Sequence, residues 1–364
     1  MALTVMEKTK AGGGPAATLS RGSDPPYTGP TADIHILNWL RSHELAIYRP
    51  PFPLPVSITH NRPPRISTPT SHTLGTLTAT PSTMSTTPEP AFVATSLSYF
   101  VPPADGSKPW QNINSDPASG KRVTNTSRAF HAVQIENLRG REAEPSLDKN
   151  GFEYFRKPAK HTSFASAQEI EAEYYPESIE LLKQLTGANR VVIFDHTIRR
   201  RRPEDKEDTP EKRQPVQGVH VDQTTASAVA RVHRHLPASD APSLLEKRFQ
   251  IINLWRPIHH PAYDFPLALC DYSTVDAERD LVPMTLKYPD RDGETFGVKF
   301  SEAHRWKYVR GMTPEEGVLI KCFDSVQDGN VAVLTPHTAF IDPSTPEDAP
   351  LRQSIELRAL VFYD

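Results

Sequence analysis

The chain has 364 residues, of which 37% are hydrophobic and 23% are charged, and its 41 Lys and Arg residues nearly balance 44 Asp and Glu residues. Such a balance gives no electrostatic reason to expect a nucleic acid or an anionic membrane surface as a partner. No stretch approaches the roughly 18 apolar residues that a membrane-spanning helix needs. The two cysteines, Cys270 and Cys322, are too few for a disulfide framework or a cysteine-based zinc site. We therefore expect a soluble, cytoplasmic protein; composition alone does not specify an oligomeric state.

Proline is concentrated near the N-terminus, where 14 of the 36 prolines fall within the first 90 residues. Residues 66–87 are mostly Thr and Ser, and a segment of this kind buries too little apolar surface to offset the entropy lost on ordering. Large apolar side chains return from Phe92 onward. We interpret residues 1–91 as a largely disordered Pro/Ser/Thr-rich segment and residues 92–364 as one folded domain.

The first predicted elements of this domain are two helices and a strand. Ser166-Ala167-Gln168-Glu169 has the form of a capping box and predicts a helix to Tyr175. Pro176 interrupts that helix and suits the first turn of a second one, which should end at Gly187. The continuous apolar run 191–194 then predicts a strand that is covered on both faces.

Several short strands follow, separated by turns rich in Pro, Asp and Gly. Residues 224–236 form the one helix that we predict among them. This pattern predicts a mainly β fold with flanking helices, built around a closed barrel or a double sheet. The predicted strands are Gly218–Asp222, Phe249–Trp255, Val298–Phe300, Val318–Phe323, Val331–Leu334, His337–Ile341 and Ser354–Tyr363.

A candidate metal site begins with His220-Val221-Asp222, the only H-x-D or H-x-E sequence in the chain. Residues i and i+2 of a strand point to the same face, so one short strand can present both side chains to a single ion. His337, at the start of a predicted strand, is the best candidate for a third ligand. Two His and one carboxylate on one side of a metal are typical of non-haem Fe(II) oxygenases. The alternative is that these are ordinary core or strand-end side chains.

A candidate carboxylate clamp follows at the start of the last strand. If strands 337–341 and 352–362 pair as a hairpin, Arg352 and Ser354 lie near the same pocket. A guanidinium and a hydroxyl there can bind the far carboxylate of 2-oxoglutarate, while its keto-acid end chelates the iron. Arg358 competes for this role because it has the same parity along the strand. Either arginine can instead form an ordinary salt bridge.

Five further residues are candidates for the substrate pocket, although core packing or a structural salt bridge explains each of them equally well. Tyr308 alternates with Trp306 and can contribute to an apolar wall, and Lys321 can attract an anionic cosubstrate or pair with Asp324. The five candidates are Asn253, Trp255, Arg256, Tyr308 and Lys321.

Several segments spread over residues 92–364 together resemble one known family. They include Tyr174-Tyr175-Pro176-Glu177, His220-Val221-Asp222-Gln223-Thr224, Asn253-Leu254-Trp255-Arg256-Pro257, Lys321-Cys322-Phe323-Asp324-Ser325, Pro336-His337-Thr338-Ala339-Phe340 and Arg352-Gln353-Ser354-Ile355-Glu356. The chain resembles the fungal gibberellin-desaturase-like group, also called AsaB-type hydroxylase/desaturases, with the related CmcJ-like proteins. This resemblance implies a double-stranded β-helix (jelly-roll, cupin-like) core that uses Fe(II), 2-oxoglutarate and dioxygen to oxidise a small-molecule secondary metabolite.

Two other functions are compatible with the same residues. A cupin-like iron dioxygenase without 2-oxoglutarate would keep the metal site and leave Arg352 with a structural role. A non-catalytic accessory protein that binds a small molecule or a partner enzyme would not retain iron, and His220→Ala would leave its role intact.

Overall fold

The computed structural model describes residues 89–205 and 209–364. The predicted N-terminal segment therefore lies outside the described residues, apart from its last three. The first strand, β1, begins at Phe92, where large apolar side chains return in the sequence.

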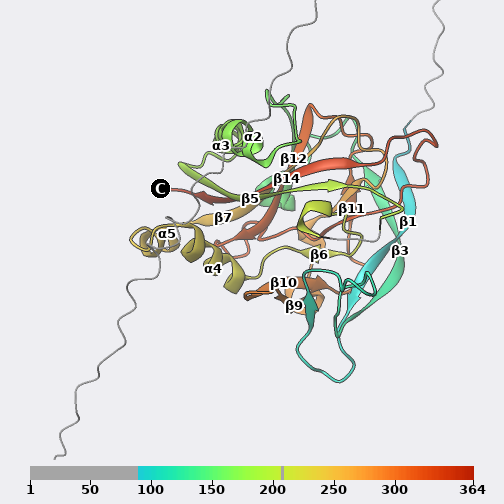
Figure 1. The fold of residues 1–364 in the computed structure, drawn as a ribbon, viewed down its shortest axis with the longest axis horizontal. Coiled ribbons are helices and arrows are strands. Elements are labelled where there is room, and N and C mark those ends of the chain that lie inside the picture. Colours follow the sequence, from blue (N-terminus) through green and yellow to red (C-terminus); the bar gives the residue numbers. More distant parts are fainter. Residues whose placement is uncertain (1–88, 206–208) are drawn as a thin grey trace, which may run out of the picture. The chain divides into compact units, whose positions relative to one another are not determined.

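Two β-sheets face each other and form the body of this part of the chain (Figure 1). The larger sheet contains, in spatial order, β1 (Phe92–Val101), β3 (Ser127–Asn137), β11 (Trp306–Tyr308), β8 (Leu267–Cys270), β13 (His337–Ala339), β6 (His220–Val221), β10 (Asp292–Val298), β9 (Leu281–Lys287) and β2 (Trp110–Asn112).

The smaller sheet is antiparallel throughout, and its central strand, β7, is buried along its entire length. Apolar side chains of both sheets, among them Phe152, Trp255 and Leu269, pack between them. These two facing sheets are the double-stranded β-helix that the sequence motifs imply. The strands of the smaller sheet are β4 (Phe152–Arg156), β12 (Glu316–Asp324), β7 (Phe249–Pro257), β14 (Gln353–Phe362) and β5 (Arg190–Arg200).

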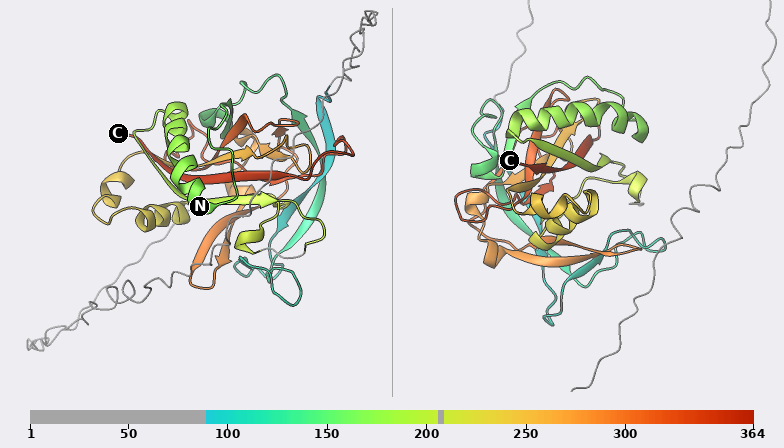
Figure 2. Two further views of the ribbon diagram at one scale, coloured as in Figure 1. Left: turned by 45° about the horizontal axis from the view of Figure 1, so that its top comes forward. Right: turned by 90° about the vertical axis from the view of Figure 1, so that its left-hand side faces the viewer.

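Two helices flank the sheets (Figure 2). Helix α3 (Tyr175–Thr186) packs on the outer face of the smaller sheet, where Leu182 contacts the odd-numbered residues of β14. Helix α4 (Thr225–His235) begins with a capping box at Thr224 and packs Ala228 and Val232 against the other face. The remaining elements are short: α1 (Leu147–Asn150), α2 (Ala167–Glu169), η1 (Ile170–Tyr174), η2 (Pro210–Lys212), α5 (Ala241–Leu245), η3 (Tyr272–Thr274) and α6 (Ala277–Asp280).

The helical prediction for residues 166–186 is largely confirmed, with one difference at Pro176. The Ser166 side chain accepts a hydrogen bond from the Glu169 amide, as the capping box predicts. The chain then does not break before Pro176 but passes through one π-helical turn, η1, directly into α3. Proline cannot donate a hydrogen bond to the preceding turn, and a wider π turn accommodates the missing bond without ending the helix.

Two strand predictions are wrong in part or in full. Residues 331–334 form no strand, because the Ala332 amide donates to the Asp148 carbonyl of α1 at 2.7 Å rather than to a sheet neighbour. Strand β10 ends at Val298, because the next amide, that of Lys299, donates to the Asp280 carbonyl. Both segments bury apolar side chains, so their hydrophobicity predicts burial correctly without predicting a β ladder.

The hairpin expected between residues 337–341 and 352–362 is also wrong. Strand β13 pairs with β6 and β8 in the larger sheet, whereas β14 pairs with β5 and β7 in the smaller one. The turn 342–350 therefore crosses from one sheet to the other, as consecutive strands do in a double-sheet barrel.

Both cysteines are free and buried. Among the described residues, no helix combines the length and apolarity required to cross a bilayer.

Candidate active site

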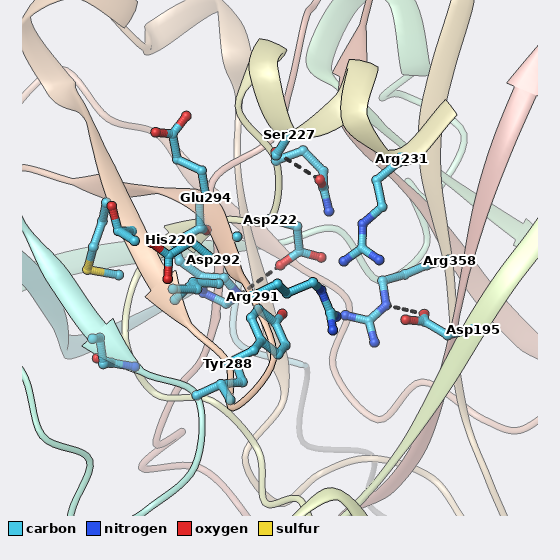
Figure 3. Close-up of a pocket in the computed structure, with 18 of the residues that line it drawn as sticks. Asp195, His220, Asp222, Ser227, Arg231, Tyr288, Arg291, Asp292, Glu294 and Arg358 are labelled. Carbon is cyan, nitrogen blue, oxygen red and sulfur yellow. Dashed lines mark hydrogen bonds and ion pairs between the residues drawn. The ribbon is translucent and has the colours of Figure 1, made fainter. Parts of the chain in front are cut away.

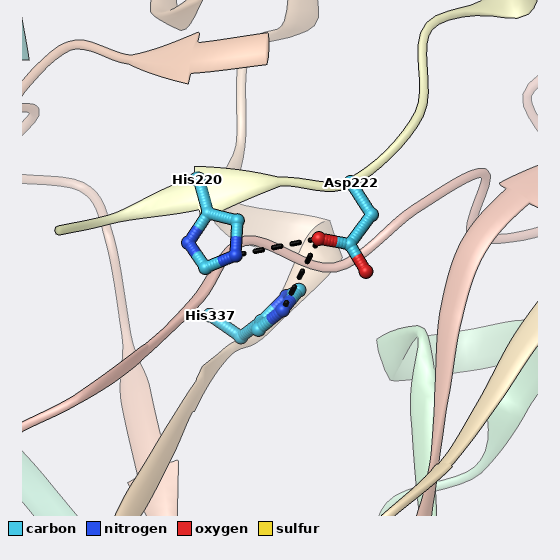
Figure 4. Close-up of side chains that lie close together, drawn as sticks. All are labelled: His220, Asp222 and His337. Atoms are coloured by element: carbon cyan, nitrogen blue, oxygen red, sulfur yellow. Dashed lines mark ion pairs between the residues drawn. The ribbon is translucent and has the colours of Figure 1, made fainter. Parts of the chain in front are cut away.

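Two histidines from neighbouring strands meet on the inner face of the larger sheet (Figure 4). His220 lies on β6 and His337 on β13, and the two residues are direct partners in the antiparallel pairing. Directly paired residues project to the same side of a sheet. Their ring centroids are consequently 4.4 Å apart.

Asp222 completes the group from the chain just beyond β6. Its Oδ1 lies 3.3 Å from Nε2 of His220 and 3.9 Å from Nε2 of His337. One ligand atom from each residue can be chosen so that all three lie within 4.8 Å of one another. The structure therefore brings together, from positions more than 100 residues apart, the three side chains selected in the sequence.

Backbone carbonyls fix the orientation of both imidazoles. Nδ1 of His220 lies 2.8 Å from the Gly218 carbonyl, and Nδ1 of His337 lies 3.0 Å from the Thr335 carbonyl. A carbonyl only accepts hydrogen bonds, so Nδ1 carries the proton and the Nε2 lone pair faces the other ligands. Histidines that bind metals are usually held in this way.

The two oxygen atoms of the Asp222 carboxylate make different contacts. Its Oδ2 accepts a hydrogen bond of 2.7 Å from the Asn253 amide and faces the Cys322 thiol at 3.7 Å. Its Oδ1 faces the two histidines. Asn253, a pocket candidate from the sequence, thus contacts the metal-ligand candidate from β7 of the opposite sheet.

Replacing Asn253 by alanine should lower Fe(II) affinity by about 10–100-fold, the usual effect of removing a group that orients a metal ligand. The Asp222 carboxylate then loses the hydrogen bond that fixes its Oδ2. Competition with a chelator of known affinity measures this loss. Asn330→Ala, at an exposed turn, is the matched control. An unchanged Fe(II) affinity in Asn253→Ala would contradict the prediction.

The protonation states of Asp222 and His337 suit a divalent cation. Burial and the neighbouring His220 charge lower the pKa of His337 to about 4, so its imidazole is neutral at physiological pH. Burial by itself raises the pKa of Asp222. The His220 hydrogen bond and the charges of both histidines outweigh this effect and lower the pKa to well below its usual range. Two imidazoles and one carboxylate are the donor set of non-haem Fe(II) centres, so these residues fit that metal.

Arg352 is a buried cation with an unfilled bonding position. Only 2% of its surface is exposed, and its Nη1 donates to the Phe265 carbonyl at 2.5 Å. Its Nε is buried and has no hydrogen-bond partner among the described residues. Burial, with the nearby charge of Arg199, lowers the pKa of Arg352 to about 9. An unbalanced buried charge is costly and is relieved by an anion.

Ser354 lies on β14 two residues after Arg352, which directly precedes that strand, and it also has an unpartnered polar atom. Its side chain is 1% exposed, and its Oγ has no hydrogen-bond partner among the described residues. Arg358, the competing candidate, is already engaged: its Nε donates to Asp195 at 2.5 Å and its Nη2 to Thr197 at 2.9 Å. The unpartnered atoms of Arg352 and Ser354 therefore fit a carboxylate better than Arg358 does.

The sequence reasoning missed Glu356, which follows Ser354 by two residues on the same face of β14. Its carboxyl is 6% exposed and makes no hydrogen bond with another described residue. Burial and the charge of Asp222 raise its pKa. The alternation from Arg352 to Arg358 along the strand was the signal that could have identified it.

The other sequence candidates do not line the cavity beside the metal-ligand candidates. Trp255 faces inward, and its ring lies 5.5 Å from the guanidinium carbon of Arg352. Arg256 faces outward and donates to the carbonyls of Lys157 and Pro314. Tyr308 packs on the outer face of the larger sheet and donates to Asp342.

Lys321 is fully buried in an ion-pair network on the smaller sheet. Its Nζ lies 2.7 Å from Oδ1 of Asp148 and 2.8 Å from Oδ2 of Asp324, which also accepts from Arg248. The pairing with Asp324 suggested by the sequence is present, so the Lys321 charge is neutralised within this network.

A cavity of about 800 Å³ adjoins the metal-ligand candidates (Figure 3). His220 and Asp222 lie in its wall, together with residues of α4, the β9–β10 hairpin and β14. This volume is within the usual range for small-molecule sites. The side chains at the metal-ligand position therefore face a space that can admit a substrate.

Comparisons with known proteins agree with this arrangement. Residues 97–362 match the family described as "Oxidoreductase/YMDC permease-like domain". The "Hydroxylase/desaturase efuI" of Hormonema carpetanum is 32% identical over 293 residues, which cover 75% of this chain and 95% of that protein. The "Fe(II)/2-oxoglutarate-dependent dioxygenase nvfI" of Aspergillus novofumigatus is 32% identical over 273 residues, which cover 72% and 94%.

A solved structure shows the same fold. The "iron and alpha-ketoglutarate-dependent endoperoxidase NvfI" aligns with a TM-score of 0.65 at 27% identity, covering 75% of this chain and 98% of that one. The resemblance stated from the sequence motifs is thereby confirmed. The chain belongs to the hydroxylase/desaturase family of Fe(II)- and 2-oxoglutarate-dependent oxygenases.

Proposed function

We propose that His220, Asp222 and His337 bind Fe(II), and that Arg352 and Ser354 bind the far carboxylate of 2-oxoglutarate. The chain then oxidises a small-molecule secondary metabolite by hydroxylation or desaturation, with dioxygen as the oxidant. The observation that carries the proposal is the convergence of three ligand atoms within 4.8 Å beside a cavity of about 800 Å³. We place this activity in the cytoplasm, where the two free cysteines stay reduced.

The residues of the chain have distinct tasks in this reaction. When bound, Fe(II) would activate dioxygen, the oxidant, which takes two electrons from 2-oxoglutarate, giving succinate and carbon dioxide, and two from the substrate. Asn253 keeps Oδ1 of Asp222 directed at the metal position by holding Oδ2. The carbonyls of Gly218 and Thr335 hold the two imidazoles in the tautomer with a free Nε2.

Arg352 and Ser354 set the orientation of the cosubstrate. A guanidinium and a hydroxyl that are both buried bind a carboxylate strongly, because water does not compete for their hydrogen bonds. The Trp255 ring against Arg352 limits the positions that the guanidinium can take.

Anaerobic titration of the full-length protein with Fe(II) and then 2-oxoglutarate tests the proposal. Chelation of Fe(II) by the keto acid should produce a visible charge-transfer band that saturates at one equivalent of iron per chain. Succinate formed in step with product on admission of air would support the reaction. Iron binding without a band would favour the iron dioxygenase that needs no 2-oxoglutarate, and failure to bind iron would overturn the metal site.

A further inference from the structure

We propose that the cavity beside the metal position binds an organic anion, an apolar small molecule with one carboxylate or a similarly charged group, and that Arg231 binds that group. This inference rests on the proposed function, because it assigns the substrate class of the same site. Arg231 is not among the residues proposed to hold the metal or the cosubstrate.

The cavity wall is far more basic than the chain as a whole. Among the described residues, nine Lys and Arg but only four Asp and Glu line it, although acidic residues slightly outnumber basic ones over the full sequence. Three of the four carboxylates are engaged: Asp222 at the metal position, Asp195 with Arg358, and Glu294 with Lys108. A cavity with one predominant sign of charge attracts ligands of the opposite sign.

Arg231 is a cation of this wall with no ion-pair partner among the described residues. It lies on α4, and its guanidinium carbon lies 5.0 Å from the centre of the Phe194 ring. It makes no hydrogen bond or ion pair with another described residue, and its side chain is half-buried. Burial lowers its pKa, the charge of Asp195 opposes this shift, and the nearby charges of Arg358 and Arg234 lower the pKa further.

Two more guanidinium groups lie around the same part of the cavity. Figure 3 shows Arg231 from α4, Arg291 from the β9–β10 hairpin and Arg358 from β14 directed toward the region beside the Asp222 carboxylate. Arg358 is paired with Asp195, and Arg291 is paired with Asp290 and lies over the Tyr288 ring. Of these three guanidinium groups, Arg231 is therefore the one that remains to pair with a ligand, while the other two add to the positive field.

The same wall carries the apolar surface that such a ligand needs. Val216, Ala230, Met284 and Leu286 line it together with the charged residues. A flat or compact hydrophobic body can pack against these side chains while one anionic group reaches Arg231. Small-molecule sites typically combine a mainly apolar wall with a few polar groups that fix orientation.

A matched pair of fluorescent probes tests this inference. 8-Anilinonaphthalene-1-sulfonate carries one anionic group, and N-phenyl-1-naphthylamine has the same ring system without it. Both are titrated into the full-length protein loaded anaerobically with Fe(II) and saturating 2-oxoglutarate. The wild type should bind the sulfonate more tightly than the neutral amine. Arg231→Gln should weaken sulfonate binding about tenfold or more, as expected for losing hydrogen bonds to a charged group, and leave the amine unchanged.

Two variants separate charge from general effects on the fold. Arg231→Lys keeps the charge and should recover part of the sulfonate affinity. Arg156→Gln, on the exposed edge of β4 and paired with Glu315, should bind both probes as the wild type does. Partial unfolding would raise the binding of both probes together, which distinguishes it from a selective loss.

The inference is overturned if the wild type binds the two probes with equal affinity. It is also overturned if the wild type binds neither probe. An equal loss of both probes in Arg231→Gln overturns it as well. A matching loss of 2-oxoglutarate affinity in that variant also overturns it, because Arg231 would then belong to the cosubstrate site. Failure of the wild type to form the charge-transfer band would overturn the proposed function, while the comparison of probes would still decide whether the cavity selects anions.

Discussion

His337→Gln will lose Fe(II) and with it almost all turnover. The variant removes one of three metal ligands, and because the metal supplies the chemistry, we expect the rate to fall by about 10³-fold or more. His337 is only 4% exposed, and a glutamine side chain is close in size to its imidazole. The substitution therefore leaves little empty space in the core. Iron content after anaerobic loading and desalting, with succinate formation, measures both effects.

The control for this variant is His233→Gln, because His233 is exposed on α4 and is not part of the cavity wall. It should retain one iron per chain and the wild-type rate of succinate formation. If His337→Gln retained stoichiometric iron and full turnover, the third ligand would have to be sought elsewhere. His220 and Asp222 would then be only part of the site.

Arg352→Gln will raise the dissociation constant of 2-oxoglutarate about 30-fold or more while leaving Fe(II) binding intact. Removing one partner of a buried, hydrogen-bonded charge pair typically costs 2–5 kcal/mol, and about 1.4 kcal/mol corresponds to a tenfold change in affinity. The charge-transfer absorbance gives this constant directly. The thermal midpoint of the cofactor-free variant should not fall, because the substitution removes a buried charge that has no acidic partner at its Nε.

A keto acid without the far carboxylate makes this test specific. The wild type should bind 2-oxoglutarate much more tightly than 2-oxobutyrate, and Arg352→Gln should lose that preference. Arg358→Gln should keep it, because the Arg358 guanidinium is bound by Asp195 and Thr197. Loss of the preference in Arg358→Gln but not in Arg352→Gln would exchange the roles of the two arginines.

The sequence by itself identified the residues whose chemical type and local spacing matter. His220 and Asp222 are two residues apart on an extended chain, so strand geometry alone directs both to one face. The capping box predicted at Ser166 likewise depends on residues three positions apart, and its hydrogen bond from the Glu169 amide to the Ser166 side chain is present in the structure. Alternation along the last strand placed Arg352, Ser354 and Arg358 on one face, although it did not decide between the arginines.

The tertiary structure decided which face of each sheet points inward and which strands are neighbours. Trp306 and Tyr308 do share a face, but β11 pairs with β8 in a register that turns them to the side opposite His337. Arg256 and Lys321 likewise point away from the cavity, because their neighbours Trp255 and Cys322 occupy the inward positions. A shift of one residue in register reverses every side chain, and no local pattern in the sequence fixes that register.

The same limit explains the error about the hairpin and the missed arginine. Whether residues 337–339 and 353–362 pair with each other or with distant strands depends on long-range contacts, which place them in different sheets. Arg231 belongs to a helix whose sequence is typical of an ordinary amphipathic surface helix. Only the packing of α4 over the cavity gives Arg231 a role. Local spacing therefore identified His220 and Asp222 as metal-ligand candidates, whereas the cavity and its charge arise from the way the two sheets and α4 come together.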